Sequence, residues 1–424
     1  MRRLAVFATL LMLMVFGLLV ALLAAEIGLR LMPGLLPEPV LYVEEQIYGR
    51  QLRAHQATGI QHYREQLDSL YLPDDYLGDR FPPGIDVLLE GHPEFTYRVR
   101  TTSLGLGDVG FRDDGLDKPP FAVAVGDSFT WGYGVEAEQD WVELLEQRTG
   151  LDFANLGMPG YGTVQNERVL MRYGLRLRPQ LILWGYFPND LEDSARFQGW
   201  LDSGTGGSFT AWKREQKVSA QRQAYAVATA RANPGSPLLR LRGWLSTHSL
   251  TYELVKYTLR RGVYLELRGE VPVRYRKGDL QLVFSPTFFS AWDPDSPLGQ
   301  RGWQLTQEAL RRSRAAAEDS GAVLIVVLIP PKEQVYWPRL APHVPPYDIE
   351  KPLARMRAFC EQEGIRYIDL TPTFAHHAAA DEQLYFNQDG HLNAAGHALA
   401  AEVVYAYLQK NSLIPVPTAC SSGT

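Results

Sequence analysis

Short apolar runs recur through the sequence after residue 120, and helical patterns separate them. The runs lie at 121–125, 153–156, 181–184, 322–329 and 367–370. The helical patterns lie at 142–146, 165–173, 304–319, 351–363 and 394–408. Short apolar strands that alternate with amphipathic helices are typical of a parallel sheet with helices on both faces. The sequence therefore predicts a three-layer α/β/α fold with a doubly wound parallel sheet.

Segments of different character frame the predicted sheet domain, which spans 121–410. A linker and an extension without clear periodicity, together 33–120, precede the domain, and a short tail, 411–424, follows it. An inserted segment, 192–298, separates the third and fourth predicted strands and includes a polar helical stretch at 213–231. Its mixed apolar and basic stretches favour a helical cap on the sheet, and a helix on a membrane surface is the alternative.

The N-terminus carries a long apolar run behind Arg2 and Arg3. Residues 4–25 contain no charge and no proline. As a helix they would extend about 33 Å, enough for a hydrocarbon core of about 30 Å. The run exceeds the core of an ordinary signal peptide, about 7–15 residues, so residues 1–32 are predicted to be an uncleaved anchor rather than a cleaved leader. The two arginines favour a cytoplasmic N-terminus, with the rest periplasmic or extracellular.

Composition and motifs exclude several classes of partner. The net charge of -6 offers no concentrated basic patch, so we predict no nucleic-acid binding. The two cysteines, Cys360 and Cys420, form no metal-binding spacing, and the histidines show no HExxH pattern. Gly105-Leu-Gly107 lacks the rest of a dinucleotide fingerprint. We therefore predict neither a metal nor a cofactor, and no disulfide to the frayed C-terminal tail.

Polar or glycine-rich motifs follow the first three predicted strands. Ser128 follows the first in Gly-Asp-Ser, Gly160 lies in the turn after the second, and Asn189 follows the third. Asp389 and His391 share one loop near the C-terminus. In an open parallel sheet, ligands bind beyond the carboxyl ends of the strands, so we expect these residues to meet at one edge.

These residue types suit attack by a serine on an ester. A nucleophilic serine needs a base beside its hydroxyl and an acid that orients the base, which Ser128, His391 and Asp389 could supply. Glycine N–H groups and a side-chain amide can donate to a developing oxyanion. Each motif alone also fits a turn, a helix cap or a polar surface loop. His376 and His377 are assigned to such a loop, and His397 to a helix interior.

In this order the motifs resemble those of the SGNH hydrolases, also called the GDSL esterase/lipase family. The resemblance covers roughly 121–191 and 299–408. It implies a flavodoxin-like fold, with Ser128 as nucleophile and His391 as base. It also implies an oxyanion hole formed by Ser128 with the residues after the second and third strands, Gly160 and Asn189.

The sequence departs from the family pattern at two places. Many members space acid and base as Asp-x-x-His, which would put Gln388 at the acid position, whereas this chain has Asp-x-His. Phe187 occupies the usual glycine of the third motif. The shorter acid–base spacing is similar to that of the SGNH-like alginate O-acetyltransferases, and so is the strand end Ile329-Pro-Pro-Lys-Glu333.

The resemblance implies hydrolysis of an acyl or acetyl ester through an acyl-enzyme. The substrate would be an ester-bearing small molecule, lipid or glycan of the cell envelope or the exterior. An O-acetyltransferase for cell-surface polysaccharide is the first alternative, and an inactive glycan-binding module is the second. A structural scaffold that acts through the inserted segment is a third. The membrane is the expected partner of the N-terminal helix, and the oligomeric state stays open.

Overall fold

The computed structural model describes most of the chain, in two compact units. The described residues are 2–32, 35–37, 40, 59–116, 118–216, 219, 237–259, 273–284, 293–336 and 348–415. One unit comprises Met1–Ala57 with Trp212–Gly269, and the other comprises Thr58–Ala211 with Glu270–Thr424. Most of the predicted helical stretch at 213–231 lies outside the described residues. The predicted domain boundaries, including the insertion at 192–298, stay predictions.

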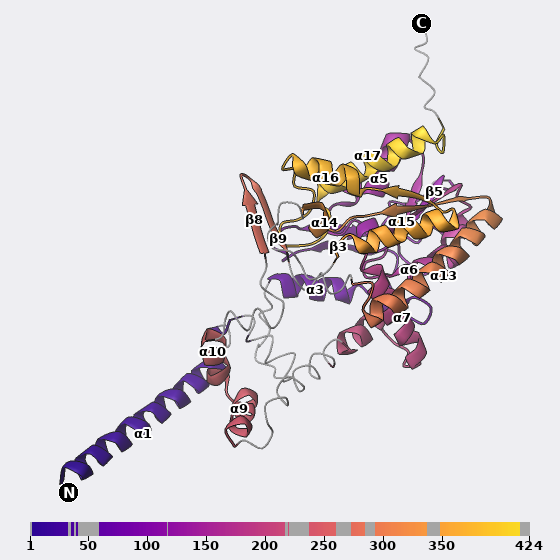
Figure 1. Ribbon diagram of the computed structural model, residues 1–424. Helices are drawn as coiled ribbons and strands as arrows, with labels where there is room; N and C mark the ends of the chain where they lie inside the picture. Colours follow the sequence, from indigo (N-terminus) through magenta and orange to yellow (C-terminus); the bar gives the residue numbers. More distant parts are fainter. Residues whose placement is uncertain are drawn as a thin grey trace. The chain divides into compact units, whose positions relative to one another are not determined.

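The larger unit contains a five-stranded parallel sheet, as predicted (Figure 1). Its strands are β5 (Ala122–Val125), β6 (Phe153–Asn155), β7 (Leu181–Tyr186), β10 (Val323–Leu328) and β11 (Arg366–Asp369). They lie in the order β11-β10-β7-β5-β6. Numbered along the chain, this order is 2-1-3-4-5, which confirms the flavodoxin-like arrangement. The strand order reverses between β5 and β7, so the expected ligand crevice lies beyond their carboxyl ends.

Helices cover both faces of this sheet (Figure 1). The helices over one face are α5 (Trp141–Thr149), α16 (Thr371–Ala379) and α17 (Ala394–Lys410). Those over the other are α6 (Thr163–Arg172), α13 (Pro297–Ser320) and α15 (Lys351–Glu363). Helix α7 (Asp190–Ser203) packs against α6 and α13. The remaining short elements are α4 (Ser128–Trp131), α14 (Lys332–Tyr336), the 3-10 helices Ala137–Gln139 and Gly174–Leu177, and the hairpin of β8 (Val273–Lys277) and β9 (Leu280–Phe284).

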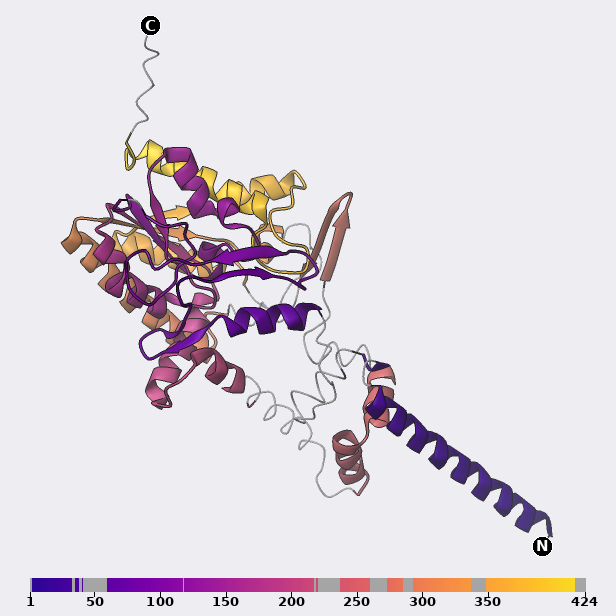
Figure 2. The same cartoon turned by 180° about the vertical axis from the view of Figure 1, so that it is seen from behind.

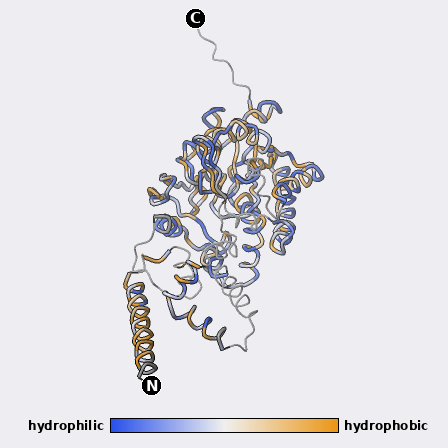
Figure 3. Tube along the Cα trace, turned by 60° about the vertical axis from the view of Figure 1, so that its left-hand side comes forward, coloured by the Kyte–Doolittle hydropathy of each residue, from blue (hydrophilic) through white to orange (hydrophobic). Residues whose placement is uncertain are grey.

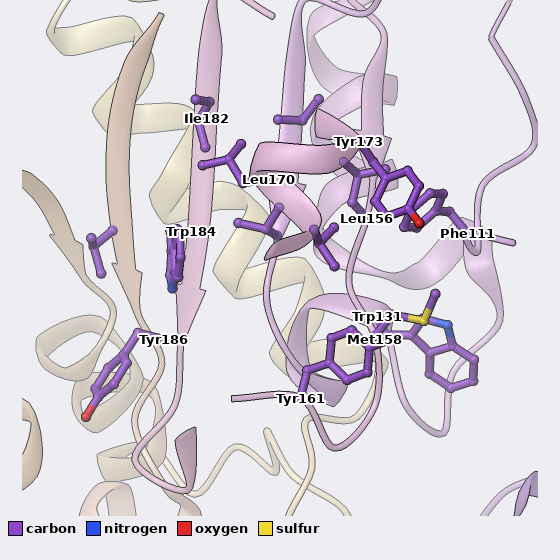
Figure 4. Close-up of a cluster of buried hydrophobic side chains, with 14 of the residues drawn as sticks. Phe111, Trp131, Leu156, Met158, Tyr161, Leu170, Tyr173, Ile182, Trp184 and Tyr186 are labelled. Atoms are coloured by element: carbon purple, nitrogen blue, oxygen red, sulfur yellow. The ribbon is translucent and has the colours of Figure 1, made fainter. Parts of the chain in front are cut away.

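The sheet has a hydrophobic core on each face because successive strand residues point to opposite sides. Along β7, Leu181 and Leu183 belong to the core beneath α5 and α17. Ile182 and Trp184 belong to the core on the α6 side, part of which Figure 4 shows. Strands buried on both faces explain why the sequence shows continuous apolar runs there rather than strict alternation.

Side chains of the N-terminal extension belong to the hydrophobic core on the α6 side of the sheet. It contains α3 (Gly59–Ser69) and the antiparallel pairs β1 (Leu72–Asp74) with β2 (Gly78–Arg80), and β3 (Asp86–Leu89) with β4 (Tyr97–Arg100). Helix α3 contacts β3 (Figure 2). Phe111 packs edge-on against Tyr173, with ring centroids 5.8 Å apart (Figure 4). From Gly59 onward, the extension is therefore part of the sheet unit.

The smaller unit contains α1 (Arg2–Leu31), α9 (Pro237–His248) and α10 (Leu250–Leu259). Thr9–Leu31 is long and apolar enough to cross a membrane, and Figure 3 shows the apolar character along the helix. Near its end, the Glu26 carboxylate accepts hydrogen bonds from the backbone N–H groups of Leu250 (3.1 Å) and Thr251 (3.0 Å) and from the Ser249 hydroxyl (2.9 Å). The first turn of α10 is thereby capped by a residue of the apolar helix.

Of the three histidines assigned from the sequence to a loop or a helix, two differ from expectation. His376 and His377 lie in helix α16, not in a loop, because Pro372 in the first turn favours a helix start at Thr371. His397 lies inside α17 as predicted, and burial lowers its pKa to about 3, so the ring is neutral. A separate prediction concerned the cysteines: Cys360 is a buried free thiol, and Cys420 lies outside the described residues.

Candidate active site

Ser128 is the first residue of α4, directly after β5. The carboxylate of Asp127 caps this helix by accepting the N–H of Phe129 at 2.9 Å. Gly126 leaves no space for a side chain, since a Cβ there would lie 2.1 Å from the Thr130 hydroxyl oxygen. The strand thus enters the helix through a tight turn that places Ser128 at the carboxyl end of the sheet, 6% exposed.

The structure brings the three predicted residues into one hydrogen-bonded series. His391 Nε2 lies 2.8 Å from Ser128 Oγ, and His391 Nδ1 lies 2.5 Å from Asp389 Oδ1. The backbone N–H of His391 donates to the same carboxylate oxygen at 2.9 Å. With Nδ1 donating to the acid, Nε2 presents its lone pair to the serine hydroxyl. The Asp-x-His spacing therefore reaches the geometry that a serine nucleophile requires.

Asp389 is held as a carboxylate. Burial alone would raise its pKa, but the charge of His391 and the hydrogen bonds from its ring and its backbone N–H lower the pKa well below the ordinary value. An anion facing Nδ1 favours the tautomer described above and would stabilise a positive charge on the ring.

Aromatic side chains enclose the imidazole on two sides. Tyr133 stacks on His391 with ring centroids 4.2 Å apart. The Phe129 ring is tilted against the His391 ring, with centroids 4.7 Å apart. Phe187 stacks on Phe129 at 3.9 Å. The residue that replaces the family glycine thus extends this aromatic wall. Tyr133 belongs to no motif, so no sequence signal pointed to it.

The predicted oxyanion donors are only partly joined by contacts. Among the described residues, the N–H groups of Ser128 and Gly160 have no intramolecular acceptor. Asn189 precedes α7 but makes no side-chain capping bond within the described part. Burial raises the pKa of the Asp127 carboxyl to about 6, and the nearby Asn189 amide partly opposes that rise. Asn189 therefore lies beside the serine turn, whereas Gly160 makes no direct hydrogen bond to Ser128 or Asn189 among the described contacts.

The turn that carries Gly160 still lies against the serine helix. The N–H of Met158 donates to the Gly126 carbonyl at 3.0 Å. A Cβ on Gly157 would lie 2.7 Å from the backbone nitrogen of Trp131, which shows how closely the two backbones approach. Gly160 itself has φ +78°, a conformation that glycine adopts at no steric cost.

A buried arginine that the sequence did not single out holds the segment after α4. Arg112 donates to the carbonyl oxygens of Trp131 (3.1 Å), Gly132 (2.6 Å) and Val135 (2.5 Å). It also donates to the carbonyl oxygen of Arg98 at 3.3 Å. This segment includes Tyr133, so Arg112 fixes the ring that stacks on the imidazole.

A buried lysine holds the loop that carries the acid. Lys332 Nζ donates to the carbonyl oxygens of Asp389 (2.8 Å), Asn387 (3.1 Å) and Phe386 (3.3 Å). Burial lowers the pKa of Lys332. The lysine belongs to the strand-end motif at 329–333, which was the one sequence signal that pointed to it.

One group of acidic side chains in the described part of the chain could hold a cation. Oxygens of Asp114, Glu143 and Glu146 lie within 4.8 Å of one another, and these side chains are exposed or half-buried. The group includes neither Ser128 nor His391. Exposed acidic groups are common without an ion, so the prediction that no metal takes part stays a prediction.

A serine, an imidazole and a carboxylate in series at the carboxyl edge of a flavodoxin-like sheet are typical of serine esterases and acyltransferases. Residues 124–270 match the GDSL-like Lipase/Acylhydrolase family, and residues 288–419 match the SGNH hydrolase-like domain of acetyltransferase AlgX. The chain is therefore an enzyme of the SGNH hydrolase family, which confirms the resemblance seen in the sequence. It is an esterase or an acyltransferase.

Solved structures with a similar fold include three relatives of low identity. TesA is 17% identical and covers 68% of this chain and 98% of its own, with a TM-score of 0.34. A catalytic mutant of an acetylxylan esterase from Geobacillus stearothermophilus is 11% identical, with 70% and 95% covered and a TM-score of 0.34. A GDSL-like lipase from Bacteroides thetaiotaomicron is 12% identical, with 70% and 92% covered and a TM-score of 0.32. No curated protein matches the chain.

Proposed function

We propose that the chain cleaves an acyl or acetyl ester through an acyl-enzyme on Ser128. The hydroxyl oxygen attacks the ester carbonyl while His391 Nε2 takes its proton, and Asp389 stabilises the imidazolium. The carbon–oxygen bond to the alcohol then breaks, and His391 returns the proton to the leaving alkoxide. The observation that carries the proposal is the 2.8 Å approach of Nε2 to Oγ, with the other ring nitrogen on the acid.

The second half-reaction decides between hydrolase and transferase. An incoming hydroxyl loses its proton to His391 and attacks the acyl carbonyl, and the serine oxygen leaves with the proton from the ring. Water as the incoming group releases a free acid, whereas a sugar hydroxyl receives the acyl group. The match of 288–419 to the AlgX domain and the Asp-x-His spacing support the second candidate, an O-acetyltransferase acting on cell-surface polysaccharide.

The location proposed for this chemistry is the outer side of a membrane. Helix α1 would anchor the chain, and Arg2 and Arg3 before the apolar run favour a cytoplasmic N-terminus. The substrate would then be an ester-bearing glycan, lipid or small molecule in the cell envelope or outside the cell.

The first test is covalent labelling of the full-length chain in detergent with a fluorophosphonate. We expect one adduct per chain by intact mass, because an activated serine attacks the phosphorus with loss of fluoride. Ser128→Ala should remove the adduct, whereas Ser203→Ala, at an exposed serine on α7, should keep it. A membrane-impermeant reagent should label the same serine in cells with an intact cytoplasmic membrane.

Each negative outcome of this test has its own meaning. A folded chain that takes no label would contradict the nucleophile and indicate a glycan-binding module. Labelling only after the cytoplasmic membrane is opened would contradict the proposed side. With an acetyl ester as donor, acetate release that is unchanged by added polysaccharide indicates the esterase, and acetylated polysaccharide indicates the transferase.

The oxyanion donors allow a second prediction. Asn189→Ala should lower kcat about 10²–10³-fold with little change in KM, because a lost oxyanion donor acts mainly on the transition state. Asn189→Ser separates this role from helix capping, since serine caps a helix well but lacks the amide. Asn411→Ala, at an exposed asparagine, is the matched control. If Asn189→Ser turned over like the unmodified chain, Asn189 would have no role in the oxyanion hole.

A further inference from the structure

The loop that carries Asp389 is held by an acidic side chain as well as by Lys332. Glu94 Oε2 accepts the backbone N–H groups of Gln388 (2.9 Å) and Asp389 (2.8 Å). Glu94 belongs to the N-terminal extension, 295 residues before Asp389. A carboxylate thus fixes the N–H groups of the loop, and the lysine fixes its carbonyl oxygens. A charged acceptor makes stronger hydrogen bonds to backbone N–H groups than a neutral one.

A second imidazole faces the acid. His92 Nε2 lies 3.9 Å from Asp389 Oδ2, the carboxylate oxygen that His391 leaves free, and the His92 side chain is 5% exposed. The His92 ring stacks on Phe95 with centroids 3.7 Å apart and lies edge-on to Tyr63 at 5.3 Å. These contacts fix the orientation of the ring toward the carboxylate.

The hydrogen bond on the other ring nitrogen of His92 determines what it can offer. His92 Nδ1 accepts the backbone N–H of Glu94 at 3.3 Å, so the neutral ring carries its proton on Nε2. Burial lowers the pKa of His92 despite the nearby Asp389 and Glu94, which favours the neutral ring. An Nε2–H group therefore lies 3.9 Å from Asp389 Oδ2, and a small closure of the site on substrate brings the two atoms to hydrogen-bond distance.

We propose that His92 and Glu94 are positioning residues for the acid Asp389. The N-terminal extension supplies both of them to the SGNH domain. Glu94 fixes the backbone of the loop, and His92 donates to the second oxygen of Asp389 once the site tightens on substrate. The carboxylate is then held at both oxygens, with Oδ1 aimed at His391. In a loop with one residue fewer between acid and base than in many family members, these contacts hold the pair in register. This inference rests on the proposed role of Ser128 and its partners.

The test compares rates of fluorophosphonate labelling, kcat and KM for a chromogenic ester, using the full-length chain. His92→Phe keeps the stacked ring but removes the Nε2–H donor, and it should slow labelling and kcat about 3- to 10-fold at unchanged KM. His92→Gln restores an amide N–H and should recover most of the rate. Glu94→Gln should slow both reactions similarly. The matched controls, His62→Phe on α3 and Glu90→Gln, change exposed side chains and should have no effect.

A double-mutant cycle shows whether His92 acts through Asp389. In an Asp389→Asn background, His92→Phe should slow labelling no further, because the carboxylate that it positions is gone. An equal loss in both backgrounds would overturn the proposal, and so would a His92→Phe chain that labels at the unmodified rate. An unmodified chain that takes no label at Ser128 would instead remove the proposed function itself. Thermal unfolding of each variant shows whether a rate loss follows from a loss of fold, and His92→Gln remains the test if His92→Phe does not fold.

Discussion

Replacing His391 by alanine should lower kcat toward a model ester about 10⁴–10⁶-fold, since a serine without its base is a weak nucleophile at neutral pH. His391 Nε2 is the group placed 2.8 Å from Ser128 Oγ to take the proton. KM should change little, because the ring contacts the reacting atoms and not the rest of the substrate. Steady-state kinetics with a chromogenic acetyl ester provides the measurement.

The matched control for this prediction is His377→Ala. His377 lies on helix α16, half-buried, with its Nδ1 3.0 Å from a Glu382 carboxylate oxygen, and it belongs to no predicted motif. Its removal should leave kcat within about twofold, since surface substitutions away from special features have small effects. Equal losses in the two variants, with both folded, would mean that the assigned base is wrong.

Arg112→Met should lower the free energy of unfolding of the sheet unit by about 3–5 kcal/mol. This is the range seen when one partner of a buried, hydrogen-bonded pair is removed. Arg112 is 1% exposed, and its side chain donates to four backbone carbonyl oxygens, three of them between the last residue of α4 and Val135. Methionine fills similar volume but removes the guanidinium donor from those oxygens. Urea unfolding followed by the signal of the buried tryptophans measures the change.

Arg98→Met gives the comparison for Arg112. Arg98 lies on the neighbouring strand β4, its side chain is 41% exposed, and its partner is the exposed carboxylate of Asp86. An exposed ion pair of this kind contributes about 0–1 kcal/mol, so this variant should unfold almost like the unmodified chain. Unfolding midpoints that fall equally in both variants would show that the buried hydrogen bonds of Arg112 do not hold the segment.

The sheet could be predicted because its strands are buried on both faces. Short apolar runs such as 181–184 and 322–329, separated by helical patterns, are typical of buried strands in a parallel sheet and of few other structures. The positions of Ser128 and Asn189 follow from the same reasoning, since the carboxyl ends of adjacent parallel strands meet at one edge. Asp389 and His391 were found because acid and base lie two positions apart in one loop.

The supports of the site escaped prediction for a different reason. Glu94 and Arg112 act through backbone groups, and any sequence offers backbone groups at every position. Glu94 lies almost 300 residues from the loop that it holds, and no periodicity marks such a pairing. His92 belongs to the extension and lies near Asp389 only in the folded unit, and Tyr133 contacts His391 from a segment that belongs to no motif. The histidines of α16 were misplaced because a short helix that opens with proline looks like a loop.

The carboxylate of Glu26 has a consequence for the order in which this protein can be made. Glu26 leaves the ribosome early, but the N–H groups that it accepts belong to residues more than 220 positions later. The smaller unit is thus discontinuous, and Thr58–Ala211 is synthesised between its two parts. Until α10 has left the ribosome, the Glu26 carboxylate on α1 cannot make these hydrogen bonds. A soluble fragment trimmed of α1 would carry the opposite defect, because the first turn of α10 would begin without its acceptor.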